Sequence, residues 1–149
     1  MAANTKPIYT LAPVASSQQL TTGNNRSDGN GTIGTDMFLV FVASTSGGYV
    51  SSLRFIPWAT AVGTATTATV IRVYLSEATV GATTSADTHL IAEVSAAAQT
   101  ADSATVGVYP IELQINKAIK GGNTVLVSIH TTPAANTGWA ATCFGGNYE

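Results

Sequence analysis

The chain has 149 residues, the length of one ordinary domain, and it is long enough to bury a core without disulfides or a structural metal. Only six basic and eight acidic residues are present, so the chain lacks the basic surface that binds nucleic-acid phosphates. No apolar run is long enough to span a membrane, and no signal peptide is evident at the N-terminus.

The composition narrows the class of protein further. Almost half of the residues are Ala, Thr, Gly or Ser, a mixture that does not favour a helical bundle or a coiled coil. The single cysteine, Cys143, cannot form an internal disulfide or a cysteine-based zinc site, and is typical of synthesis in a reducing compartment. Because a surface with so few charges offers little protection against association, we expect a protein that packs against its own copies and a larger partner.

The N-terminal part of the chain is expected to be irregular. Residues 1–15 form an extended arm in this interpretation, because Pro7 and Pro13 flank apolar residues in a segment too rich in proline for a central strand. A first strand is expected near Ser16–Thr22. The glycines and asparagines of Thr21–Gly34 then predict a loop of tight turns.

Seven further strands are indicated by apolar residues that alternate with polar ones or form short continuous runs. Pro57 predicts that its strand ends, bulges or lies at a sheet edge there. Ser95–Ala104 is expected to be a loop or at most one helical turn. The expected strands are Thr35–Ser44, Tyr49–Trp58, Thr69–Ser76, His89–Ser95, Thr105–Asn116, Thr124–His130 and Gly138–Phe144.

This pattern predicts an all-β fold with antiparallel strands, because parallel strands would need long crossover connections. Eight strands would suit a jelly roll, and seven an immunoglobulin-like sandwich. We expect a jelly-roll-like, two-sheet sandwich over residues 16–149, preceded by the arm. Trp58, Trp139 and Tyr109 alternate with polar neighbours and are expected in the core.

No catalytic motif surrounds the residues that could perform chemistry. His89 and His130 are expected on outward strand faces, and neither lies in a hydrolase or metalloprotease motif. Glu93 and Glu112 are the only acids in the middle of strands, and no aromatic platform accompanies them. An enzyme is therefore the last of our hypotheses.

A metal or nucleotide site is not expected either. Asn24–Gly31 is superficially like a calcium loop, but Arg26 stands at a ligand position and no glutamate closes the loop. Asp28-Gly29 and Asn30-Gly31 are better explained as turns. Glycine-rich phosphate-binding motifs between a strand and a helix are also missing, so we expect no cofactor.

Self-association is expected through Arg72 and Tyr74, which share one face of a strand and belong to residue types that are common at interfaces.

Three turn-rich stretches also carry a family resemblance. They are Asn24–Thr32, Lys120–Val125, and Gly138-Trp139 with Gly145–Tyr148. In these stretches the chain resembles the short β-rich virion proteins of tailed bacteriophages, especially head-decoration (cement) and fibre-base proteins. The resemblance implies no enzyme activity, often a trimer, and attachment to the major capsid protein or a tail component. It supplies no catalytic residues.

We therefore expect a non-enzymatic structural virion protein, assembled in the host cytoplasm, that decorates and stabilises the capsid exterior by binding the major capsid protein. A trimer is favoured, and neither nucleic acid nor a membrane is an expected partner. The docking segment is expected to include Lys6, Pro7, Ile8, Tyr9, Leu11 and Val14. The alternative is a tail- or fibre-associated module that binds a receptor or glycan through the loops Gly23–Gly34, Gly81–Thr88 and Thr132–Gly138.

Overall fold

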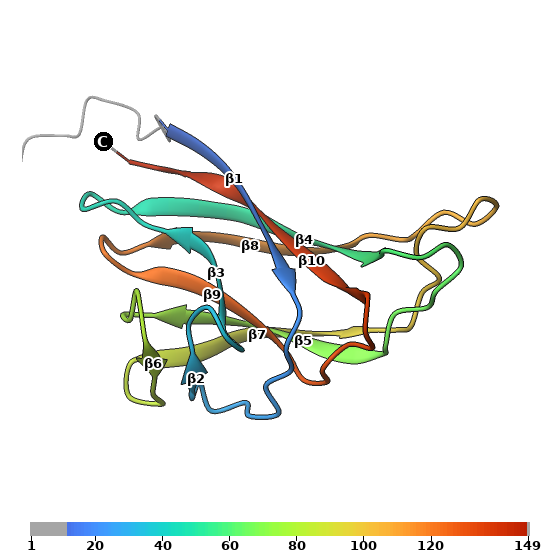
Figure 1. Cartoon of the computed structure of the whole chain (residues 1–149). Coiled ribbons are helices and arrows are strands. Elements are labelled where there is room, and N and C mark those ends of the chain that lie inside the picture. The colour runs from blue at the N-terminus through green and yellow to red at the C-terminus, as the bar shows by residue number, and fades with distance from the viewer. Residues whose placement is uncertain (1–11, 149) are drawn as a thin grey trace, which may run out of the picture.

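The computed structural model describes residues 12–148, which form two packed four-stranded sheets and a small two-stranded ribbon (Figure 1). Sheet A contains, in order across the sheet, β1 (Ala12–Leu20), β10 (Thr137–Asn147), β4 (Gly48–Ala59) and β8 (Ile111–Ile119). Sheet B contains β3 (Phe38–Val42), β9 (Thr124–Ile129), β5 (Thr69–Ser76) and β7 (Thr88–Ala96). The ribbon pairs β2 (Gly31–Thr32) with β6 (Ala82–Thr83).

The strand order is that of a jelly roll. When the eight long strands are numbered 1 to 8 along the chain, the strand order is 1-8-3-6 in sheet A and 2-7-4-5 in sheet B. Every neighbouring pair is antiparallel. The predicted antiparallel sandwich is therefore confirmed, and the first strand completes the jelly roll rather than the seven-stranded alternative.

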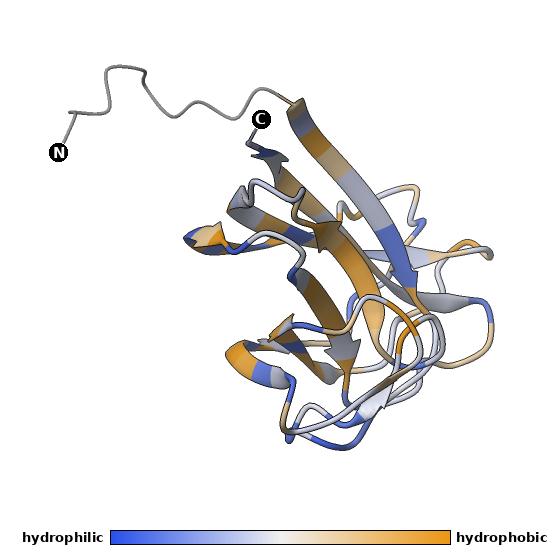
Figure 2. Ribbon diagram, turned by 90° about the vertical axis from the view of Figure 1, so that its left-hand side faces the viewer, coloured by the Kyte–Doolittle hydropathy of each residue, from blue (hydrophilic) through white to orange (hydrophobic). Residues whose placement is uncertain are grey.

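The core forms where the inward faces of the two sheets meet. Leu53 and Phe55 of β4 are fully buried, whereas Arg54 between them points to the outer face of sheet A. On β10, Trp139 and Cys143 are also fully buried, and for Trp139 this confirms the expected place in the core. Figure 2 shows the apolar residues along the facing strands of the sandwich. Period-two alternation thus places one face of each of these strands in a shared core.

The strand predicted to begin at Thr105 begins instead at Ile111, and Tyr109 is 76% exposed rather than buried in the core. The Gln99 side chain explains the difference, because its amide oxygen accepts from Tyr109 N at 2.7 Å and its amide nitrogen donates to Tyr109 O at 3.0 Å. The backbone of Tyr109 is thereby satisfied outside any sheet. Trp58, also predicted in the core, is only partly buried.

The boundary expected between an arm and the sandwich at residue 15 is also wrong. β1 already begins at Ala12, where it pairs with Asn147, and Val14 packs against the core of the sandwich.

Pro57 lies near the end of β4. The pairing of β4 with β8 ends at Phe55, so at Pro57 the strand is paired only with β10. The expectation that Pro57 marks a partly free edge is therefore confirmed.

Candidate functional site

Within residues 12–148, each sheet has two edge strands without a partner on one side: β1 and β8 in sheet A, and β3 and β7 in sheet B. β1 and β3 lie side by side along one side of the sandwich (Figure 1). Side chains of β7 and β8 meet along another side, where they line a common groove. The open sides of the sandwich are therefore the candidate surfaces for interaction.

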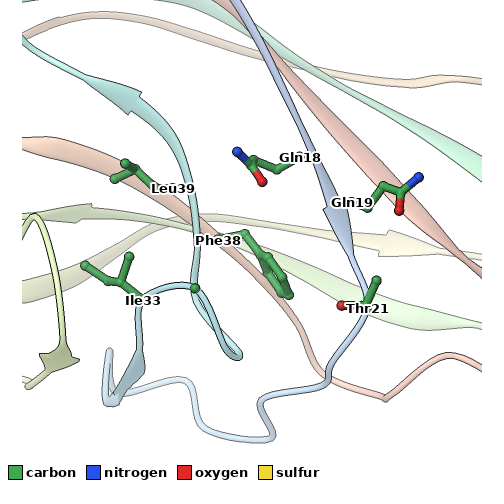
Figure 3. Close-up of a pocket in the computed structure, with 7 residues that line it drawn as sticks. Gln18, Gln19, Thr21, Ile33, Phe38 and Leu39 are labelled. Atoms are coloured by element: carbon green, nitrogen blue, oxygen red, sulfur yellow. The ribbon is translucent and has the colours of Figure 1, made fainter.

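The groove between β1 and β3 consists of two adjoining hollows. The larger, of about 490 Å³, lies between the end of β1 and the start of β3 (Figure 3). The smaller, of about 290 Å³, continues along both strands and shares Gln18 and Leu39 with the first. The larger hollow is lined by Gln18, Gln19, Thr21, Ile33, Gly34, Phe38 and Leu39. We call the two hollows together the β1–β3 groove. Its mixture of apolar and uncharged polar side chains suits an extended peptide segment.

The groove between β7 and β8 has a volume of about 400 Å³ and a mainly apolar lining. Ile91, at its rim, is 42% exposed, and the adjacent Leu90 is 38% exposed. The lining residues are Leu75, Ile91, Ala92, Gln114, Ile115, Lys117, Ala118 and Ile119. This groove is a second candidate surface for a protein partner.

The structure contradicts the prediction that Arg72 and Tyr74 form a self-association surface. Tyr74 is fully buried and Arg72 is 8% exposed, because residues 21–37 fold over the outer face of sheet B. Arg72 binds Glu93 at 2.7 Å and donates to the backbone oxygens of Asn24 and Arg26. These two outward-facing residues therefore hold the chain's own loop and are not available to a second copy.

Two of the three loops proposed for glycan recognition lie together. The β2–β6 ribbon joins Gly23–Gly34 to Gly81–Thr88, and Thr83 Oγ1 donates to Gly29 O at 2.7 Å. Gly29 has a φ of +84°, and a side chain there would collide with the backbone of Thr88, so glycine is required for this contact.

The first of these loops also contacts the start of the third. Gly23 N donates to Thr132 Oγ1 at 2.9 Å. Beside this contact is a polar hollow of about 540 Å³, lined by Gly23, Asn24, Asn25, Arg26, Asp36, His130, Thr131 and Thr132. The hollow brings hydrogen-bond donors and acceptors together, as a site for a hydroxyl-rich ligand requires.

The residues considered for catalysis or metal binding are not brought together. Glu93 pairs with Arg72 on the outer face of sheet B, and Glu112 pairs with Arg54 on the outer face of sheet A. His89 and His130 are exposed, as predicted. Within residues 12–148, no three His, Cys, Asp or Glu side chains form a group that could hold a metal ion.

The turn that is superficially like a calcium loop is held by its own side chains. Asp28 accepts from Arg26 Nη2 at 2.5 Å and from Asn30 Nδ2 at 2.7 Å. The Arg26 hydrogen bond, assisted by the backbone N–H of Asn30, holds the pKa of Asp28 well below its usual range. The carboxylate thus stabilises the turn, as predicted from the Asp-Gly and Asn-Gly pairs.

The buried thiol of Cys143 is expected to be unreactive in the folded protein. Its side chain is fully buried, and burial raises the pKa of the thiol to about 12. Near pH 8, native protein should react with a disulfide reagent at least about a thousandfold more slowly than protein in denaturant, because the thiolate is the reacting form. Absorbance of the released thiol measures both rates, and similar rates would contradict this placement.

No family model, curated protein or solved structure matches this chain. In the described part of the chain, no helix is long and apolar enough to cross a membrane.

Neither groove was predicted from the sequence. The uncharged sequence of β1 was a usable signal, because an edge strand without charged side chains is open to pairing. The expected docking residues Lys6, Pro7, Ile8, Tyr9 and Leu11 lie outside the described residues.

Proposed function

We propose that this protein is a non-enzymatic structural component of a bacteriophage particle, which decorates and stabilises the capsid exterior by binding the major capsid protein. The observation that carries the proposal is the uncharged, exposed strand β1 beside an open groove. An edge of this kind promotes aggregation of a freely diffusing protein, because other chains can pair with it. It is typical of a protein whose edges are covered by partners in an assembly.

The composition and the turn motifs add to this support. With 9% charged residues, the chain has few of the charges that keep surfaces apart in solution. Repetition on a symmetric shell would multiply weak contacts into stable attachment. The protein would assemble onto particles in the host cytoplasm and remain in the virion.

Residues 6–11 are proposed as the segment that particle binding requires, whereas Val14 belongs to β1, where it packs against the core and lines the smaller hollow of the β1–β3 groove. A variant that lacks residues 1–11 retains β1 and every other strand. We expect it to fold but to lose its association with particles.

Fractionation of particles on a density gradient, with peptide counting against the major shell protein, tests the proposal. Hundreds of copies per particle would support decoration, whereas a handful would move the protein to the tail or a fibre. Complete absence from particles would overturn both virion locations. Normal particle binding by the variant without residues 1–11 would overturn the role of the arm.

The second candidate function is a tail- or fibre-associated module that binds a receptor or glycan. The observation that favours it is the polar hollow beside Asn25, Asp36 and His130. A glycan array probed with the intact protein tests it, with an Asn25→Ala, His130→Ala double variant as the control. Binding that disappears in the variant would support this function, and an array without hits would count against it.

A further inference from the structure

The free edges of the two sheets differ in how they are protected against pairing with another strand. β3 has only five residues, and its register with β9 shifts between Leu39 and Phe41. β7 contains His89 and Glu93, and its register with β5 is also interrupted. β8 contains Glu112 and Lys117, and Asn116 between them has a φ of +48°. Short length, charge and irregular backbone each discourage edge-to-edge association.

β1 has none of these features. It is nine residues long, contains no charged side chain, and pairs with β10 without interruption from Ala12–Asn147 to Leu20–Trp139. Most of its residues are exposed, and β1 lies along the outside of the sandwich in both views (Figures 1 and 2). Pro13, near the start of β1, has no N–H to donate. From Val14 to Leu20, the backbone N–H and C=O groups on the outer side of β1 form a regular template for one more strand.

We propose that the strand added to β1 is the β1 of a second copy, paired antiparallel about a twofold axis at Ser16. Full overlap of the nine residues places Ala12 of each copy opposite Leu20 of the other. The same register places Ala15 opposite Ser17. The central side chains of β1 are small and uncharged, so two identical edges can approach without steric or electrostatic conflict.

A second reason to choose a second copy is the position that this register gives to the chain before β1. Eleven residues lie before Ala12, and in this register they begin beside Leu20 of the other copy. Thr21 follows Leu20 directly and lines the larger hollow of the β1–β3 groove, together with Ile33 and Phe38 (Figure 3). The arm of each copy therefore starts at the groove of the other.

The composition of the arm matches this position. Residues 8–11 are Ile, Tyr, Thr and Leu, and the hollow offers apolar side chains with uncharged polar ones at its rim. An extended segment of eleven residues spans up to about 36 Å, so the arm is long enough to follow the groove. The pairing does not require the capsid. If the proposed particle function also holds, a dimer, in place of the trimer expected from the family resemblance, is the unit that binds the shell, and loss of the arm weakens binding through the dimer.

Charges placed on exposed positions of β1 test both the pairing and its register. In the Ala15→Lys, Ser17→Lys variant, each lysine would lie opposite a lysine of the second copy. The matched control, Ala15→Lys, Ser17→Glu, places a lysine opposite a glutamate at the same positions. Both side chains are exposed in the single chain, so neither variant disturbs its core. Sedimentation of the full-length protein measures the result.

The wild type and the lysine–glutamate control should sediment as dimers of the 15.2 kDa chain. The double-lysine variant should dimerise at least about tenfold more weakly. Mixing it with Ala15→Glu, Ser17→Glu should give a mixed dimer that is stronger than the dimer of either variant alone. A monomeric or trimeric wild type would overturn the proposal, as would equal dimerisation of all variants. Deletion of residues 1–11 should also weaken the dimer, and an unchanged dimer would exclude the arm from it. These outcomes need no particles, so they are separate from the test of particle binding.

Discussion

Replacement of Arg72 by methionine is expected to lower the free energy of unfolding by about 2–4 kcal/mol. The Arg72 side chain is 10% exposed and bridges three groups: the carboxylate of Glu93 and the backbone oxygens of Asn24 and Arg26. Methionine would fill much of the same space but would leave the Glu93 carboxylate and the Asn24 oxygen without this donor, whereas the Arg26 oxygen would keep the hydrogen bond from Tyr74 Oη. The loss of unfolding free energy should therefore exceed the contribution of an ordinary exposed ion pair.

Arg54→Met is the matched control for this prediction. Arg54 also pairs with a glutamate on the neighbouring strand, Glu112, but the two side chains are 43% and 46% exposed. We expect a loss of less than about 1 kcal/mol, because water replaces the partner at an exposed pair. Urea unfolding compares the two variants, and similar losses would contradict the buried position of Arg72.

The Arg72→Met variant should also loosen the segment that Arg72 holds. Residues 21–37 cover the outer face of sheet B, and Asn24 and Arg26 lie within that segment. Their backbone amides should exchange with deuterium faster in this variant than in Arg54→Met. Unchanged exchange would show that the segment is held by its contacts with Met37 and Tyr74 alone. If the polar hollow binds a glycan, the same variant should weaken that binding.

Alternation along the sequence was sufficient to predict most of the strands. The inward face of β4, with Leu53 and Phe55, and that of β10, with Trp139 and Cys143, follow directly from a side-chain period of two. The same reasoning failed at Tyr109, where alternation continues but the Gln99 side chain binds the backbone. Local periodicity contains no information about a side chain ten residues away.

The positions of Arg72 and Tyr74 show a second limit of sequence patterns. Both residues face away from the core, as the alternation predicted, yet neither is at the surface. A segment that begins about fifty residues earlier in the chain, the one containing Asn24 and Arg26, forms a third layer over them. Alternation separates the two faces of a strand, but it does not show which outward face is covered.

The candidate interaction surface was the least accessible to sequence analysis. Whether a strand lies at an edge depends on which strands pair, and β1 pairs with β10 at the other end of the chain. The composition of β1 was readable in the sequence, but its free edge and the groove beside it follow from the topology. The docking residues expected from the sequence therefore lie in the arm and at Val14 near the start of β1, and the rest of β1 was not among them.

Replacement of Trp139 by alanine should cost about 3–5 kcal/mol of stability, one of the largest losses available in this fold. Trp139 is fully buried, and its position on β10 lies between Leu20 of β1 and Pro57 of β4. The truncation would leave a cavity where sheet A packs against the core. For a domain of this size the midpoint of thermal unfolding should fall by roughly 6–20 °C.

Tyr109→Ala is the control that separates the structure from the alternation pattern. Sequence periodicity places both aromatic residues in the core, whereas the structure buries Trp139 fully and leaves Tyr109 76% exposed. The Gln99 hydrogen bonds to residue 109 use only its backbone, so they survive the substitution. We therefore expect a change within about 0.5 kcal/mol for Tyr109→Ala. Urea unfolding measures both variants. Comparable losses of unfolding free energy would mean that β8 extends toward Thr105 and would contradict the loop before Ile111.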